Sequence, residues 1–458
     1  MNSFLRLEDK NGSAVILGDG RRISYREFAA QSDSLSRDLR VGDLAVVECD
    51  NSLNSLLAYI GALRREIPML LVDGSLQRSQ KKRLYEQYAV SMIFSPRNAI
   101  WERVNEHGPP VNPNVALLLS TSGTTCSPKL VRLSLSNLVA NAEQISNYLE
   151  LSSSSTAITL LPQHYSFGLS IINSHLIAGG CLAVTSSSVT ERRFWELVRI
   201  AEVESISGVP ATFQQLAKLR IERMELPSLK TLTQAGGRLS PDLVKSFGNL
   251  AAKRGWRFFI MYGQTEATAR MSYLPTRTVC SKNSSIGIAI PGGKFELIDE
   301  NKCVINSPYS VGELVYYGPN VMLGYSETIG DLTRGDDQRG RLETGDLAEF
   351  DEEGFYYLKG RLKRIVKVFG NRISLDEVES FLQGNGWNVV ATGRDDLILV
   401  VGVDSHTVLL SAEAVSKLCR IHRSGIGTLT VSELPVSSSG KIQYWQLVNQ
   451  YEGTAAYT

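Results

Sequence analysis

The segment Ser120-Thr121-Ser122-Gly123-Thr124-Thr125-Cys126-Ser127-Pro128-Lys129 decides how this sequence is interpreted. It follows residues 115–119, a continuous apolar run that predicts a buried strand. Ligands of open parallel sheets bind at the carboxyl ends of strands, where this segment is expected. Its backbone N–H groups and hydroxyls can bind phosphate oxygens, and Lys129 can offset their charge. The segment therefore predicts a phosphate loop without the Walker spacing, and the alternative is a polar surface turn.

Strand-like and helix-like patterns alternate around this loop through the first 260 residues. Residues 44–49 and 69–72 read as strands on either side of a helix over 52–65. Ser24 and Glu27 form a capping box that predicts a helix start. Alternation of this kind predicts an α/β fold of doubly wound, largely parallel sheets with helices on both faces.

The pattern changes after about residue 285, where short β segments follow one another between turns. We expect an N-terminal domain over residues 1–361, with a small β subdomain over about 286–360. Residues 362–458 predict a small, mobile α+β C-terminal domain, in which Ser374 and Glu377 begin a helix. A chain of 458 residues is long enough for two or three domains.

Composition excludes several function classes. The formal net charge is +1, so no global electrostatic case for nucleic-acid or membrane partners follows. The five histidines show no metal-ligand spacing, and the six cysteines form no CxxC pair. The polar N-terminus and the lack of a long apolar run predict a cytoplasmic protein with reduced cysteines.

Three further segments carry chemistry-bearing residues. Tyr262-Gly263-Gln264-Thr265-Glu266 follows a predicted strand and offers an aromatic ring, a hydroxyl and a carboxylate. Asp346 and Arg361 offer a hydrogen-bond acceptor and a planar donor group suited to ribose hydroxyls. Lys441 follows a serine- and glycine-rich stretch near the C-terminus. The alternative for each segment taken alone is an ordinary surface turn or loop.

Together, in this order, the segments resemble those of the adenylate-forming superfamily, which includes acyl-CoA synthetases, peptide synthetase adenylation domains and firefly-type luciferases. The resemblance covers nearly the whole chain, including a Gly312 to Tyr325 motif and a Gly360 to Ile373 motif. It departs at Cys126 and Leu130, where the family loop usually has glycine.

The resemblance assigns roles to individual residues. Lys129 would bind the β- and γ-phosphates, Tyr262 would stack on adenine, and Glu266 would bind Mg²⁺. Asp346 and Arg361 would hold the ribose. The residues that the resemblance assigns to ATP are Thr121, Ser122, Gly123, Thr124, Thr125, Lys129, Gly236, Gly237, Arg238, Tyr262, Gly263, Gln264, Thr265, Glu266, Asp346 and Arg361.

The resemblance also implies a reaction. ATP and Mg²⁺ would convert a carboxylic acid into its acyl-adenylate, with Lys441 at the reacting groups and Lys363 as the hinge of the mobile domain. The acyl group would pass to a thiol of coenzyme A, or to the phosphopantetheine of a separate acyl carrier protein. The alternatives are transfer to an amine by an amide synthetase, and a nucleotide-binding relative that has lost catalysis.

The substrate class is less constrained. Residues 162–168 resemble the PxxHxxG stretch of acyl- and aryl-acid activating members, with His164 either at the carboxylate pocket or in the core. This stretch lacks the Asp that binds an α-ammonium group, so a non-amino acid is favoured. Residues 209–213 and 267–271 are expected as pocket walls. Within them Arg270 is expected in solvent, and pairing with a second substrate carboxylate is the alternative.

Overall fold

A computed structural model describes most of the chain. The described residues are 3–120, 129–436 and 442–455. They form two compact units, and each unit is described by itself. Unit 1 comprises Met1–Lys294 and Tyr316–Leu342, and unit 2 comprises Phe295–Val315 and Glu343–Thr458. The predicted domain boundary after residue 361 and the mobility of the C-terminal domain stay predictions.

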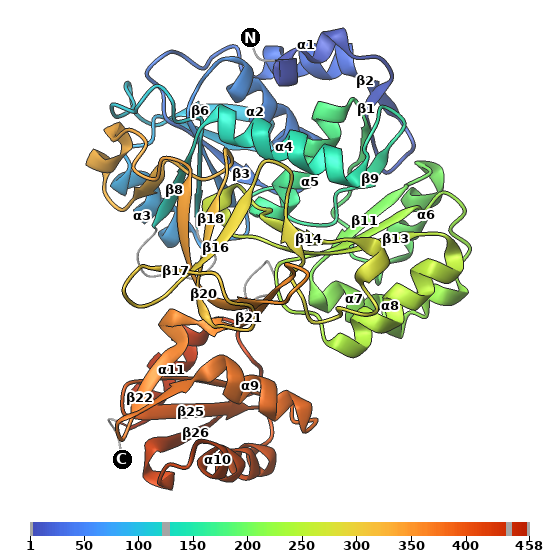
Figure 1. Ribbon diagram of the computed structural model, residues 1–458. Coiled ribbons are helices and arrows are strands. Elements are labelled where there is room, and N and C mark those ends of the chain that lie inside the picture. The colour runs from blue at the N-terminus through green and yellow to red at the C-terminus, as the bar shows by residue number, and fades with distance from the viewer. Residues whose placement is uncertain (1–2, 121–128, 437–441, 456–458) are drawn as a thin grey trace. The chain divides into compact units, whose positions relative to one another are not determined.

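Unit 1 contains a seven-stranded sheet in the order β19-β8-β7-β4-β3-β5-β6 (Figure 1). Its strands are β3 (Ala45–Cys49), β4 (Met69–Asp73), β5 (Met92–Ser95), β6 (Ile100–Arg103), β7 (Leu117–Ser120), β8 (Leu130–Leu133) and β19 (Gly324–Ser326). The central strands β7, β4, β3 and β5 pair in parallel, and the strands at the two edges are antiparallel. The predicted strands over 44–49, 69–72 and 115–119 are confirmed.

A nine-stranded sheet forms the other half of unit 1, in the order β15-β14-β13-β12-β11-β9-β10-β1-β2. Its strands are β1 (Ser13–Ile16), β2 (Arg22–Ser24), β9 (Thr156–Ile158), β10 (Cys181–Ala183), β11 (Ser205–Gly208), β12 (Thr231–Gln234), β13 (Arg257–Tyr262), β14 (Ser272–Leu274) and β15 (Ile288–Ala289). The strands from β13 to β1 are parallel, and β14, β15 and β2 complete the edges antiparallel.

Helices cover both sheets. They are α1 (Tyr25–Leu35), α2 (Leu53–Arg64), α3 (Arg78–Gln87), α4 (Leu135–Leu149), α5 (Ser166–Ala178), α6 (Arg192–Ile200), α7 (Pro210–Lys218) and α8 (Pro241–Arg254). The capping box of Ser24 and Glu27 begins α1, as predicted. The fold is therefore the predicted α/β fold with layered sheets.

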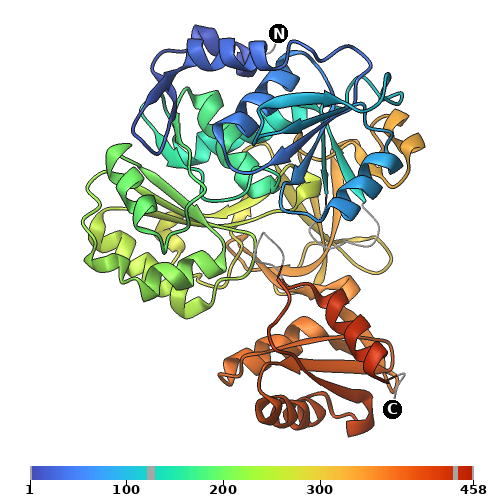
Figure 2. The ribbon, with the colours of Figure 1, turned by 180° about the vertical axis from the view of Figure 1, so that it is seen from behind.

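The helices α4 and α5 lie in the region between the two large sheets (Figures 1 and 2). Tyr148 of α4 stacks on Tyr273 of β14, with ring centroids 4.4 Å apart. Tyr59 of α2 donates a hydrogen bond of 3.1 Å to Asn173 of α5. The two helices thus join both sheets through buried polar and aromatic contacts, and α5 is buried along nearly its whole length.

Unit 2 begins in a five-stranded sheet in the order β17-β16-β18-β20-β21. These strands are β16 (Lys294–Ile298), β17 (Val304–Ile305), β18 (Gly312–Tyr317), β20 (Arg341–Phe350) and β21 (Tyr356–Arg361), and they correspond to the predicted β segments. The rest of unit 2 combines two small sheets with three helices, namely β22 (Ile365–Val368), β23 (Asn371–Ser374), α9 (Leu375–Gly384), β24 (Val389–Arg394), β25 (Leu397–Gly402), α10 (Ser405–Cys419), β26 (Ile426–Thr430) and α11 (Tyr444–Ala455). Ser374 caps α9 by accepting a hydrogen bond from the Glu377 N–H, as predicted.

The described cysteines are all free thiols. None of the helices in the described ranges combines the length and the apolar character that a membrane crossing requires. The largest fully buried side chains of the described residues include two arginines, Arg132 and Arg270.

Arg132 of β8 holds a distant segment of unit 1 against the seven-stranded sheet. Its guanidinium is buried and lies 2.7 Å from the Asp337 carboxylate. It also donates hydrogen bonds to the backbone carbonyls of Tyr325, Arg334 and Gly335. Because β19 pairs with β8 directly beside this network, Arg132 stabilises the position of the chain around Tyr325.

We expect Arg132→Met to lower the free energy of unfolding of unit 1 by about 3–5 kcal/mol, because it removes the donor to three carbonyls and the buried partner of Asp337. Urea unfolding followed by circular dichroism measures this loss. Arg334→Met is the matched control, since Arg334 contacts the same carboxylate at 3.3 Å but is largely exposed. The control is expected to cost less than about 1 kcal/mol, and equal losses in the two variants would contradict the role given to Arg132.

Candidate functional site

The predicted phosphate loop begins at the carboxyl end of β7, where Ser120 is exposed. Its residues Thr121, Ser122, Gly123, Thr124 and Thr125 lie outside the described residues, as does Lys441. Their assigned roles therefore stay predictions. Lys129, the last residue of the loop, is described and stands directly before β8.

Lys129 lies beside two residues that follow it by almost two hundred positions. Its Nζ is 3.6 Å from the centroid of the Tyr325 ring and 3.2 Å from a carboxylate oxygen of Glu327. The antiparallel pairing of β8 with β19 causes this proximity, because Leu130 is the partner of Ser326. A lysine on an aromatic face with a half-exposed ion pair can exchange that partner for an anionic ligand.

Tyr325 links Lys129 to Glu266. Its hydroxyl donates a hydrogen bond of 2.9 Å to Oε1 of Glu266. Burial and the adjacent Glu266 carboxylate raise the pKa of Tyr325, so the phenol remains a proton donor at neutral pH. The structure therefore brings together two predicted site residues, Lys129 and Glu266, through one whose role the sequence analysis did not identify.

The turn after β13 presents the predicted residues Tyr262, Gly263, Gln264, Thr265 and Glu266. Nε2 of Gln264 donates to the Tyr262 hydroxyl at 3.3 Å. A side chain at Gly263 would place its Cβ 1.7 Å from a carbonyl oxygen further along the turn, so only glycine fits there. Thr265 and Glu266 lie in a short 3₁₀ helix (Thr265–Ala267). This close packing fixes both side chains at the strand end.

A second strand end, after β12, carries Gly236, Gly237 and Arg238. Gly236 has a φ of +80°, and a Cβ there would lie 2.4 Å from the Tyr165 hydroxyl. Gly237 and Arg238 are exposed. The absence of a side chain at Gly236 thus leaves room for Tyr165, which precedes α5. The assigned role of these three residues in ATP binding stays a prediction.

His164 lies beside a carboxylate that the sequence analysis did not single out. Its Nε2 is 3.7 Å from Oδ2 of Asp73, the last residue of β4. Burial lowers the pKa of His164, and the Asp73 carboxylate opposes that change. The ring therefore lies at the carboxyl end of the seven-stranded sheet. The sequence did offer a sign of its partner, because Asp73 is an acidic residue directly after the predicted strand over 69–72.

The expectation that Arg270 lies in solvent is wrong. The side chain is 2% exposed. Ser170 of α5 and Tyr148 of α4 each accept a hydrogen bond of 3.1 Å from its guanidinium. The residues around it form the interior between α4, α5 and β13. The sequence gave no sign of this burial, because Arg270 is a charged residue that stands two positions before a strand.

In unit 2, the predicted pair Asp346 and Arg361 is formed. The two residues are direct partners in the β20–β21 pairing, and Nε of Arg361 lies 2.9 Å from Oδ1 of Asp346. Asp346 is buried, whereas Arg361 is largely exposed. Lys363 lies in the 3₁₀ helix that follows (Leu362–Arg364). The binding of ribose by this pair and the hinge role of Lys363 stay predictions.

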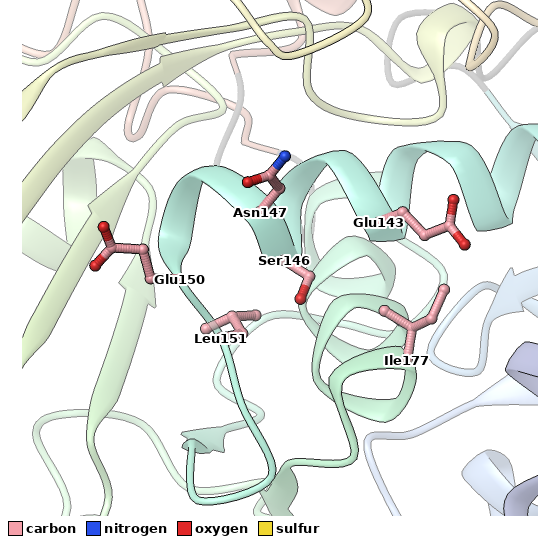
Figure 3. Close-up of a pocket in the computed structure, with 6 residues that line it drawn as sticks. All are labelled: Glu143, Ser146, Asn147, Glu150, Leu151 and Ile177. Carbon is pink, nitrogen blue, oxygen red and sulfur yellow. The ribbon is translucent and has the colours of Figure 1, made fainter.

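One surface pocket of unit 1 does not coincide with these groups. Figure 3 shows it at the C-terminal half of α4 and the end of α5. Its lining residues are Glu143, Ser146, Asn147, Glu150, Leu151 and Ile177. None of them is a predicted site residue, so this pocket is not the candidate site.

Glu266 is the residue that the resemblance assigns to Mg²⁺. The described residues contain no cluster of three or more His, Cys, Asp or Glu side chains of the kind that holds a metal alone. Mg²⁺ usually keeps several waters and is bound by one or two carboxylates together with phosphates. Glu266 is half-buried and its Oε1 accepts a hydrogen bond from Tyr325, so this carboxylate fits that pattern beside Lys129.

Layered parallel sheets with a lysine, a carboxylate and a glycine turn at their strand ends define a nucleotide-binding α/β protein. The chain belongs to the AMP-binding enzyme family, whose model matches residues 95–326. This match spans the region from β5 to β19 and confirms the resemblance to the adenylate-forming superfamily.

Curated relatives are CoA ligases and luciferases. The chain is 29% identical over 274 residues to a probable CoA ligase, CCL9, of Humulus lupulus, covering 59% of this chain and 51% of that protein. It is 31% identical over 278 residues to a probable 4-coumarate–CoA ligase of Dictyostelium discoideum, covering 59% and 49%. A luciferin 4-monooxygenase of Photuris pensylvanica is 26% identical over 356 residues, covering 74% and 64%. The chain thus spans about half the length of the first two relatives.

Solved structures share the whole fold. The o-succinylbenzoate coenzyme A synthetase of Bacillus subtilis, in complex with AMP, superposes with a TM-score of 0.80 at 21% identity, covering 98% of both chains. ATP-bound MatB of Rhodopseudomonas palustris gives a TM-score of 0.76 at 21% identity, covering 99% of both chains. At this identity the likeness establishes the fold.

We expect Glu266→Gln to remove most of the Mg²⁺ dependence of ATP binding while leaving the turn intact, because the amide oxygen still accepts from Tyr325 but carries no charge. Calorimetric titration of ATP with and without Mg²⁺ measures this. The Mg²⁺-dependent gain in affinity should fall about tenfold or more. Glu150→Gln, an exposed carboxylate on α4's end, is the control, and an undiminished gain in Glu266→Gln would refute the metal role.

Proposed function

We propose that this protein uses ATP and Mg²⁺ to activate a non-amino carboxylic acid as its acyl-adenylate and then transfers the acyl group to a thiol. The observation that carries the proposal is the connected group of Lys129, Tyr325 and Glu266 at the strand ends of unit 1. It offers a cation and a metal-binding carboxylate beside the loop expected to bind phosphates.

The first step joins two anions and therefore needs positive charge and alignment. A carboxylate oxygen of the acid attacks the α-phosphorus of ATP, the bond to the bridging oxygen breaks, and pyrophosphate leaves. Lys129 exchanges Glu327 for oxygens of the departing pyrophosphate, and Thr265 faces the α-phosphate. Mg²⁺, when bound, neutralises phosphate charge. Lys441 supplies a further cation at the reacting groups.

Neighbouring residues keep these groups oriented. Ser166 of α5 lies 3.2 Å from the Thr265 hydroxyl, so the start of α5 is tied to the strand-end turn. His164, held neutral by burial, lines the same end of the seven-stranded sheet as Lys129. Asp346, oriented by Arg361, accepts hydrogen bonds from ribose hydroxyls.

The second step releases AMP. A thiolate attacks the carbonyl carbon of the acyl-adenylate, the bond to the phosphate oxygen breaks, and a thioester forms. We assign the thiol to coenzyme A or to the phosphopantetheine of a separate carrier protein, and a cytoplasmic location without nucleic-acid or membrane partners is part of the proposal. The CoA ligases among the curated relatives support the choice of a thiol.

ATP–pyrophosphate exchange tests the first step against a panel of fatty, hydroxy, aryl, dicarboxylic and amino acids. Exchange that depends on one class of acid, followed by thioester formation with coenzyme A or a carrier protein, is the expected result. Binding of ATP and Mg²⁺ without exchange for any acid would refute the proposal and favour a relative that has lost catalysis.

We expect Lys441→Ala to reduce exchange at least about 100-fold while changing ATP affinity less than about threefold, because this lysine would stabilise charge that develops during the reaction. Exchange kinetics and calorimetric ATP binding measure the two effects. Lys417→Ala, on the exposed face of α10, is the control. An equal loss of ATP binding and exchange would overturn the role given to Lys441.

A further inference from the structure

Arg270 is a buried cation without a carboxylate partner. Its side chain is 2% exposed, and no carboxylate of the described residues lies within ion-pair distance of it. The backbone at Arg270 is held in place, because its carbonyl accepts hydrogen bonds from the side chains of Asn141 at 3.0 Å and Asn320 at 3.1 Å. A charge held in the interior without a counter-charge is costly, which calls for a reason.

Three other arginines with side chains at most 13% exposed follow the usual rule. Arg132 lies 2.7 Å from Asp337, Arg64 lies 2.7 Å from Asp33, and Arg364 lies 2.9 Å from Glu379. Each therefore has a carboxylate at hydrogen-bond distance. Arg270 is the exception among these four arginines. All four have little exposed surface, so Arg270 differs from the others in lacking a carboxylate partner among the described residues.

The partners of Arg270 are neutral and leave part of its donor capacity unused. Nε donates to Ser170 at 3.1 Å, and Nη1 donates to Tyr148 at 3.1 Å and to the sulfur of Met261 at 3.4 Å. The guanidinium also lies 5.2 Å from the centroid of the Phe167 ring. A guanidinium has five N–H donors, and within the described residues Nη2 has no hydrogen-bond partner.

Two titratable neighbours of Arg270 within the described ranges, His175 and Tyr148, add no negative charge. His175, also buried on α5, is held neutral, because burial, with a smaller contribution from Arg270, lowers its pKa to about 4. Burial raises the pKa of Tyr148, so its hydroxyl stays neutral as well. The interior between α4 and α5 therefore holds a net positive charge that an anionic ligand would neutralise.

The α5 residue that contacts Arg270 lies about one helical turn from the α5 residue at the reacting end of the proposed site. Ser166 contacts Thr265, which is assigned to the α-phosphate, and Ser170 contacts Arg270. Four residues of helix separate the two serines, or about 6 Å along the axis. Phe167 lies between them on the same helix and faces the guanidinium.

We propose that Arg270 binds a second carboxylate of the acid that is activated, so that the substrate is a short dicarboxylic acid. This inference rests on the proposed function. One carboxylate reacts beside Thr265, and the other pairs with Nη2 and Nη1 of Arg270, with a spacing on the order of 6 Å. Phe167 and the apolar surroundings exclude water from this ion pair, which strengthens it.

The test uses the wild-type protein with dicarboxylic acids of three to eight carbons and their monomethyl esters. The esters keep one reactive carboxylate and replace the second by a neutral group of similar shape. We expect pyrophosphate exchange with kcat/KM about 10- to 100-fold higher for the best diacid than for its ester. Equal or better use of the ester would overturn the inference without any variant being made.

The variant Arg270→Met tests whether this residue causes the preference for the diacid over its ester. The diacid should lose its 10- to 100-fold advantage, mainly through KM, while the ester changes little. Arg257→Met is the control. It removes a cation at the first residue of β13 and should keep the full preference for the diacid over its ester. A preference that persists in Arg270→Met would refute the role of this arginine, and the wild-type comparison stands even where this variant does not fold.

A binding measurement separates this inference from the proposed function. Calorimetric titration of the diacids, in the presence of a non-hydrolysable ATP analogue, detects binding without chemistry. Diacid binding that the monomethyl ester lacks, together with no exchange, would retain the dicarboxylate site and reject the adenylation. Exchange with monocarboxylic acids alone would retain adenylation and reject the dicarboxylate site.

Discussion

The antiparallel pairing of β8 with β19 is the contact on which the site of unit 1 depends. It joins the end of the predicted phosphate loop to a strand almost two hundred residues later and sets Lys129 over the ring of Tyr325. Arg132, buried in β8, ties the chain beyond β19 to the sheet. Without this pairing, the lysine and the Glu266 carboxylate would have no fixed relation.

The cations of this protein differ in how their charges are paired. The side chains of Arg132 and Arg364 are at most 13% exposed and pair with carboxylates, and they serve the fold, because breaking such pairs leaves costly unpaired charges. Lys129 is half-exposed, and an anionic ligand can replace its carboxylate partner at little cost. Arg270 is nearly as buried as Arg132, but it has no carboxylate partner among the described residues. This combination points to a ligand.

Much of the fold could be predicted because its signals are local. Continuous apolar runs predicted the parallel strands, and Ser24 with Glu27 predicted the start of α1 through a capping box four residues long. The placement of α4 and α5 between the sheets could not be predicted, since it depends on sheet order. The burial of Arg270 was missed for the same reason, because an arginine in a loop ordinarily lies in solvent.

The sequence by itself determined which chemical groups follow the strands and in what order, because hydroxyls, glycines, lysines and carboxylates at strand ends are properties of short segments. This was sufficient to identify the family and to propose the class of reaction. Only the tertiary structure decided which side chains meet: Tyr325 with Glu266, His164 with Asp73, and Arg270 with α4 and α5. Contacts between residues tens to hundreds of positions apart depend on the order of strands in the sheets and on the packing of the helices between them, which no local pattern encodes.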